Sequence, residues 1–122
     1  MATQSQVDQI TRQAAQQAIV EARQKTTNLK QYGLVAKQLP VQIRRHGLGH
    51  MLVFLEKRGK DRDTSPYTVL KRQIEQHLAQ VLHERTGGLA MLTERDSRVY
   101  WLATRQVDRF LNELLVFVEK FA

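Results

Sequence analysis

The last quarter of the chain carries one continuous apolar stripe. Its apolar residues recur at intervals of three and four, which places them on one face of an α-helix. A long helix with such a face must pack it against other elements. We therefore expect this helix to form the spine of the core. The stripe comprises Val99, Ala103, Val107, Phe110, Leu114, Phe117 and Phe121.

The rest of the chain shows shorter helical patterns. No segment alternates apolar and polar residues over a sustained length, so we expect no β-sheet. The 122 residues are the size of one domain. We predict an all-α fold, a compact bundle of five to six helices with the long C-terminal helix as its core, in a single domain over 1–122. Its expected parts are a Gln/Ala-rich N-terminal helix (1–28), a basic central segment (32–59) and C-terminal helices (66–122).

Proline and glycine indicate the helix boundaries of the central segment. Pro40 lacks an amide hydrogen and disfavours helix at the residue before it. We expect it to separate a helix over 29–38 from a short helix over 40–46. Gly47 fits a left-handed position at a helix end, and a further helix is expected over 48–58.

The second half has similar boundary signals. Gly59 ends the helix before it, and Ser65 followed by Pro66 is a typical helix start, with serine as the cap. We predict that this helix runs to about Glu84. The other predicted boundaries are an end or a bend of the first helix at Thr26–Asn28, a short turn over Leu89–Leu92, and a cap at Thr93 or Asp96 for the last helix.

Positive charge is concentrated in the first half of the chain. The net charge is +7. Residues 1–60 hold ten Lys/Arg and three Asp/Glu, whereas residues 61–122 hold nine of each. Such an uneven distribution predicts a surface that binds a polyanion. The alternative is that the charge only keeps the protein soluble, and an even distribution would suit that better.

Six basic residues of the central segment are the candidate phosphate contacts. If the pieces before and after Gly47 pack as a hairpin, these side chains can form one stripe along a nucleic-acid backbone. The alternative is an ordinary solvated helix face, and the shortage of acids argues against it. The candidates are Lys37, Arg44, Arg45, Lys57, Arg58 and Lys60.

The residue patterns of enzymes and metal sites are missing. The chain has no cysteine, which excludes a thiolate zinc site and a cysteine nucleophile. His46 and His50 stand four apart but lack the glutamate of the HExxH motif. Asp61 and Asp63 share a loop with two basic residues and are expected to form local ion pairs. We expect no catalytic site, metal, cofactor or small-molecule substrate.

Two other side chains stand out by position. His77 lies on the apolar side of its helix and is expected to be hydrogen-bonded and partly buried. Trp101 lies opposite the stripe of the last helix, on the face that carries Arg105 and Asp108. Two interpretations of Trp101 remain open: it covers the turn over Leu89–Leu92, or it anchors a protein partner.

Targeting signals are also missing from the sequence. No apolar run approaches the roughly 20 residues needed to span a bilayer. The first residues lack the charged and apolar regions of a signal peptide. We expect a cytoplasmic protein that does not contact membranes.

Three stretches set apolar and turn residues in a characteristic order over about 90 residues. With these residues, the chain resembles the small helical subunit of the Cmr complex, the type III-B CRISPR RNA-silencing effector. The stretches are Tyr32, Ala36, Leu39-Pro40, Ile43, Gly47-Leu48, Leu52 and Phe54-Leu55; then Tyr67 and Leu70; then Tyr100, Ala103-Thr104, Phe110-Leu111, Phe117 and Lys120-Phe121-Ala122.

The resemblance implies a non-catalytic role in antiviral defence. Copies of such a subunit stack head to tail as a minor filament beside the backbone subunits. The filament lines the groove where the target RNA pairs with the guide RNA, and cleavage belongs to the backbone subunits. The implied partners are the other Cmr subunits, guide RNA, target RNA and further copies of the same chain.

Two other functions remain as alternatives. A helical DNA-binding regulator would need a turn-linked recognition helix, and Pro40, Gly47 and Gly49 interrupt the segment where it would lie. A small helical protein–protein adaptor would need no nucleic acid. Failure to retain RNA or DNA at low salt would favour the adaptor.

Overall fold

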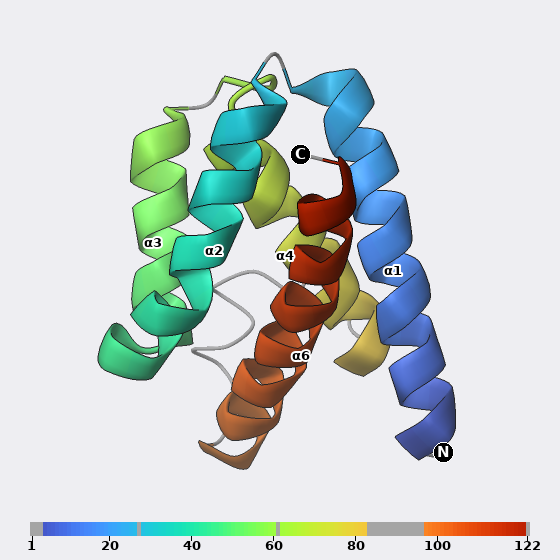
Figure 1. The fold of residues 1–122 in the computed structure, drawn as a ribbon. Helices are drawn as coiled ribbons and strands as arrows, with labels where there is room; N and C mark the ends of the chain where they lie inside the picture. The colour runs from blue at the N-terminus through green and yellow to red at the C-terminus, as the bar shows by residue number, and fades with distance from the viewer. Residues whose placement is uncertain (1–3, 27, 61, 83–96, 122) are drawn as a thin grey trace.

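The computed structural model describes the chain except residues 1–3, 27, 61, 83–96 and 122. The described residues form no strand and five α-helices, so the prediction of an all-α bundle is confirmed (Figure 1). The helices are α1 (Gln4–Lys25), α2 (Leu29–His46), α3 (Leu48–Gly59), α4 (Pro66–Leu82) and α6 (Ser97–Phe121).

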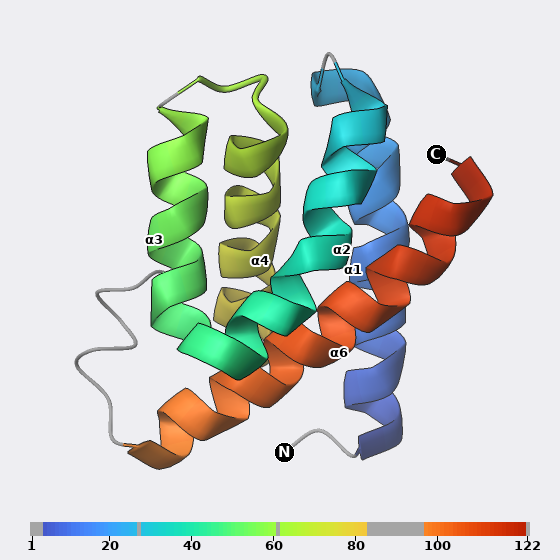
Figure 2. The ribbon, with the colours of Figure 1, turned by 60° about the vertical axis from the view of Figure 1, so that its left-hand side comes forward.

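Helix α6 crosses the bundle obliquely, while the chain runs up and down through the other four helices (Figure 2). It contacts α1, α2 and α4. Most of the predicted stripe faces inward: Ala103, Val107, Phe110 and Leu114 are buried, and Phe117 packs against the core. The prediction of α6 as the spine of the core is therefore confirmed.

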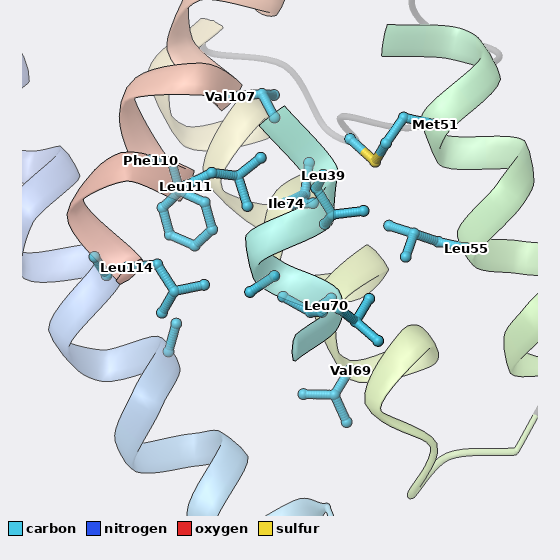
Figure 3. Packing of buried hydrophobic residues seen from close by; sticks show 14 of the residues in the cluster. Leu39, Met51, Leu55, Val69, Leu70, Ile74, Val107, Phe110, Leu111 and Leu114 are labelled. Atoms are coloured by element: carbon cyan, nitrogen blue, oxygen red, sulfur yellow. The ribbon is translucent and has the colours of Figure 1, made fainter. Parts of the chain in front are cut away.

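Helix α2 lies between α6 and the hairpin partner α3. In Figure 3, Leu39 of α2 has Phe110 and Leu111 of α6 on one side and Met51 and Leu55 of α3 on the other. All five side chains are almost completely buried. Both helices of the basic central segment thus contribute buried side chains to the core.

Pro40 does not divide α2 into two helices, and the prediction of a separate helix over 40–46 was wrong. A proline inside a helix removes one hydrogen bond and costs about 3 kcal/mol. Here Leu39, Pro40 and Ile43 are all buried, so the apolar face continues through the proline. Burial of Leu39 and Ile43 offsets a cost of this size. The helix bends in its second half instead (Figure 2).

Gly47 alone connects α2 to α3. Its positive φ of 90° agrees with the prediction, but its ψ of 162° places it outside the left-handed helical region. Its N–H donates to the carbonyl of Ile43 (2.9 Å), and its own carbonyl accepts from the N–H of Met51 (3.2 Å). One residue therefore caps both helices.

The other described boundaries follow the sequence closely. Helix α1 ends at Lys25, and the side chain of Asn28 caps α2 by accepting from the N–H of Gln31 (3.0 Å). Helix α3 ends at Gly59, and α4 begins at Pro66 directly after Ser65. The predicted end at Glu84, the turn over Leu89–Leu92 and the caps at Thr93 or Asp96 lie outside the described residues.

A buried hydrogen-bond chain joins three helices. The hydroxyl of Tyr32 on α2 donates to Oε1 of Gln73 on α4 (2.5 Å). The Nε2 of Gln73 donates to the backbone carbonyl of Ala18 on α1 (2.9 Å). Burial, with the negative charge of Glu21 as a smaller contribution, raises the pKa of Tyr32 well above its usual value. Tyr32 therefore stays a neutral donor.

Candidate nucleic-acid interface

The six predicted phosphate contacts all lie exposed on the α2–α3 hairpin or directly after it. Because the two helices run antiparallel from Gly47 (Figure 2), the hairpin separates the six into groups. Arg44 and Arg45 lie at the turn, and Lys57, Arg58 and Lys60 lie at the far end of α3. A helix of 12 residues is about 18 Å long, so the groups are a comparable distance apart. Lys37 lies between them along α2.

The far group is held by an aromatic contact and by a close helix packing. The guanidinium carbon of Arg58 lies 5.5 Å from the ring centroid of Phe54, and Phe54 meets Tyr67 edge-on at 6.0 Å. Gly59 packs so closely on α4 that a Cβ there would clash with the hydroxyl of Thr68. Lys60 then turns the chain in a left-handed conformation (φ 49°, ψ 42°).

The turn group is positioned by α6. The hydroxyl of Tyr100 accepts a hydrogen bond from the backbone N–H of Gly49 at 2.8 Å. Gly47 lies so close that a Cβ there would be 3.3 Å from the same hydroxyl oxygen. Tyr100 thus ties the last helix to the turn beside Arg44 and Arg45.

Arg44 also lines a groove between α2 and α6 with a volume of about 320 Å³. Two basic residues of this groove, Arg105 and Arg109, were missed in the sequence. The prediction was based on the net charge of each half of the chain, and the second half has none. Their spacing of four on one helix was the available signal. The full lining is Ile43, Arg44, Thr104, Arg105, Asp108 and Arg109.

Trp101 is 56% exposed. The guanidinium carbon of Arg105, one helical turn further on, lies 4.8 Å from the centroid of its ring. The sequence placed these two residues on one face of α6, and that is confirmed. The turn over Leu89–Leu92, which Trp101 was proposed to cover, lies outside the described residues.

The other side chains considered for chemistry are two histidines of the α2–α3 turn and the aspartates of the loop after α3. The rings of His46 and His50 are 4.8 Å apart and both residues are exposed. Asp63 pairs with Arg72 of α4 at 3.4 Å rather than with its loop neighbours. Within the described ranges, no three His, Cys, Asp or Glu side chains are grouped to hold a metal ion.

His77 is almost completely buried, where partial burial was predicted, and the expected hydrogen bond was wrong. Its ring stacks on Phe110 with the centroids 4.9 Å apart. Neither ring nitrogen has a hydrogen-bond partner among the described residues. Burial lowers the pKa of His77 to about 4. The side chain is therefore neutral at physiological pH.

None of the described helices is long and apolar enough to cross a membrane.

Comparison with known proteins identifies the family. The profile of the CRISPR-associated protein family Cas_Cmr5 matches residues 7–121. The fold is similar to the crystal structure of a CRISPR-associated Cmr5 family protein from Thermus thermophilus, with a TM-score of 0.65 and 26% sequence identity. That match covers 98% of this chain and 97% of the other. A comparison with the curated proteins gave no match. The chain therefore belongs to the Cmr5 family of CRISPR-associated proteins, the family of a subunit of the type III-B Cmr complex.

Proposed function

We propose that this protein is a non-catalytic, cytoplasmic subunit of the type III-B effector complex. The α2–α3 hairpin contacts the backbones of guide RNA and target RNA. Copies of the subunit associate with one another by stacking in a minor filament, next to the other Cmr subunits. Cleavage of the target belongs to those other subunits.

The observation that carries this proposal is the charge on the hairpin. Helix α2 contains four Lys/Arg residues and no acid, and α3 contains Glu56 as its one acid. The two basic groups lie about 18 Å apart along α3, several times the axial rise of about 3.4 Å between phosphates of one strand. The hairpin is thus long enough to contact several phosphates.

Such contacts position the RNA but do not read its sequence. Lys and Arg side chains that neutralise phosphates give affinity, which falls with salt, and leave base identity unread. In an RNA-guided complex, base pairing between guide and target supplies the specificity. A basic hairpin is sufficient for this role.

The hairpin argues against a helix-turn-helix regulator. In that motif a turn of three to four residues separates the two helices, whereas Gly47 alone separates α2 from α3. No room remains for the turn that sets a recognition helix across the groove of DNA.

Charge reversal at the two ends of the hairpin tests the proposal. We would measure binding of single-stranded RNA and of a guide–target duplex over a range of salt concentrations. The variants are Arg44→Glu with Arg45→Glu, and Lys57→Glu with Arg58→Glu. Each pair should weaken binding and lower the salt slope for single strands by about 1.4, the value for two lost phosphate contacts.

The matched control carries the same charge change elsewhere. Lys25→Glu with Lys120→Glu alters two exposed residues of α1 and α6 and should affect binding much less. Circular dichroism checks that all variants remain helical. An unchanged salt slope in both hairpin variants contradicts the proposal. If the unmodified protein retains neither RNA nor DNA at low salt, the adaptor function is favoured.

A further inference from the structure

The groove between α2 and α6 contains basic residues that do not belong to the hairpin. Arg44, Arg105 and Arg109 line it together with one acid, Asp108. Arg109 is neutralised by Asp8, with the two side chains 3.0 Å apart. In the described part of the chain, no carboxylate forms an ion pair with Arg44 or Arg105. Two exposed guanidinium groups are thus available for an anion.

Asp108 is the one lining group that opposes an anion. Its Oδ2 accepts a hydrogen bond from Nδ2 of Asn112 at 3.3 Å. The hydroxyl of Thr104 donates to the carbonyl of Tyr100 at 2.9 Å, so it supplies no donor to the groove. The donors for a ligand are therefore the two arginines.

Trp101 lies next to this groove, because its ring contacts Arg105, which lines the groove. The guanidinium of Arg105 covers one face of the indole at 4.8 Å, while more than half of the Trp101 surface stays exposed. Single-strand binding proteins combine a positively charged groove, which follows the phosphates, with aromatic side chains on which the bases stack. Here an exposed indole lies next to the arginines of the groove.

We propose that this groove binds an unpaired nucleotide of single-stranded RNA. Arg44 and Arg105 contact its phosphate, and a base stacks on the face of Trp101 that Arg105 leaves uncovered. The proposal rests on the proposed function, because Arg44 belongs to both surfaces. It adds a selectivity that phosphate contacts lack: bases within a duplex are already stacked on their neighbours, so only an unpaired base can reach the indole.

Fluorescence provides a direct test because Trp101 is the one tryptophan of the chain. The intact protein is titrated with a 12-nucleotide oligouridylate, with a 12-base-pair RNA duplex and with oligoglutamate of matched charge. Binding of end-labelled RNA is followed in parallel by fluorescence anisotropy. We expect saturable quenching of Trp101 by the single strand, and several-fold less quenching by the duplex and the peptide.

Variants separate stacking from charge. Trp101→Ala should weaken single-strand binding about tenfold, which corresponds to about 1.4 kcal/mol of lost stacking. Trp101→Phe, which retains an aromatic ring, should recover most of the loss. Val116→Ala changes a residue that is 55% exposed on the same helix and should have no effect. Arg105→Gln should lower the single-strand salt slope by about 0.7.

The outcomes distinguish this inference from the proposed function. RNA binding that depends on Arg44 and Arg45 but leaves Trp101 fluorescence unchanged overturns the inference and keeps the proposed function. Equal quenching by duplex and single strand overturns the selectivity for unpaired bases. Equal quenching by oligoglutamate identifies the groove as a protein-docking site instead. If the protein binds no RNA at all, both proposals fail.

Discussion

The hydroxyl oxygen of Tyr100 accepts a 2.8 Å hydrogen bond from the backbone N–H of Gly49. The two residues are 51 positions apart in the chain. Gly49 lies in the first turn of α3, where backbone N–H groups have no partner within the helix. The bond therefore satisfies a helix end and connects the last helix to the turn that carries Arg44 and Arg45.

Removing this hydroxyl should destabilise the protein. Tyr100→Phe keeps the ring but leaves the N–H of Gly49 without its acceptor, so we expect a loss of about 1 kcal/mol in the free energy of unfolding. Urea denaturation followed by circular dichroism measures it. Tyr67→Phe, on a tyrosine with no described hydroxyl hydrogen bond, is the control and should change stability less. Equal losses in the two variants would count against a special role for Tyr100.

A second prediction concerns Gly47 beside the same hydroxyl. Gly47→Ala places a side chain at a φ of 90° and brings its Cβ to 3.3 Å from the Tyr100 hydroxyl oxygen. This positive-φ, extended-ψ backbone region is populated almost only by glycine and costs another residue about 1–3 kcal/mol, and the contact adds to that. We expect Gly47→Ala to lower the urea midpoint more than Tyr100→Phe does.

The double variant separates the two causes. Phenylalanine at position 100 removes the crowded oxygen but leaves the backbone strain. Gly47→Ala combined with Tyr100→Phe should therefore cost less than the sum of the single variants. Strict additivity would mean that the Cβ contact contributes nothing and that backbone strain is the whole effect.

The helices could be predicted because their signals are local. The stripe of α6 repeats along the whole helix, and the cap residues Asn28 and Ser65 stand where α2 and α4 begin. Pro40 was misinterpreted because the prediction used only the local helix propensity of proline and not the tertiary packing around it. Its helix-breaking tendency is outweighed by the burial of Leu39 and Ile43 against neighbouring helices, which no short window reveals.

The candidate interface could be predicted only in part, for the same reason. Charge counting found the basic hairpin, and helical spacing put Trp101 and Arg105 on one face of α6. The groove depends on how α6 crosses α2, which brings Arg105 to the same groove as Arg44 from 61 positions away. The angle at which two helices cross depends on side-chain packing between them. The sequence alone therefore did not predict that Arg44 and Arg105 line one groove.

A third prediction tests the buried chain of Tyr32, Gln73 and Ala18. Tyr32→Phe removes the donor to Gln73 and leaves Oε1 of Gln73 buried without a partner. We expect a loss of about 1–3 kcal/mol in the free energy of unfolding, the cost of an unpaired buried polar group. Thermal unfolding by circular dichroism provides the measurement.

A second variant separates the cost of the unpaired Gln73 oxygen from the contribution of the Gln73–Ala18 hydrogen bond. Gln73→Met, in the background of Tyr32→Phe, removes the unpaired amide oxygen but also the bond to the carbonyl of Ala18. If the unpaired Oε1 is the main cost, the second change should add little to the first. A large further loss would place the main contribution in the bond to Ala18.

The last prediction concerns His77 and acid. Its pKa is about 4 in the folded protein and near 6.5 in the unfolded chain. Between these values the unfolded chain binds the proton and the folded protein does not, so stability falls as the pH drops below 6.5 and levels off below 4. At pH 5 this one group should reduce the free energy of unfolding by about 2 kcal/mol relative to pH 7.5.

Denaturation at pH 7.5 and pH 5 in a set of variants assigns the effect to His77. His77→Leu removes the titrating ring, so the difference between the two pH values should shrink by about the same 2 kcal/mol, whatever the variant costs in stability at pH 7.5. His50→Gln, at an exposed site, should leave the difference intact. Glu21 lines the same cavity as His77, so Glu21→Gln is included to detect a contribution from its carboxylate. A pH difference that persists in His77→Leu would show that another group causes it.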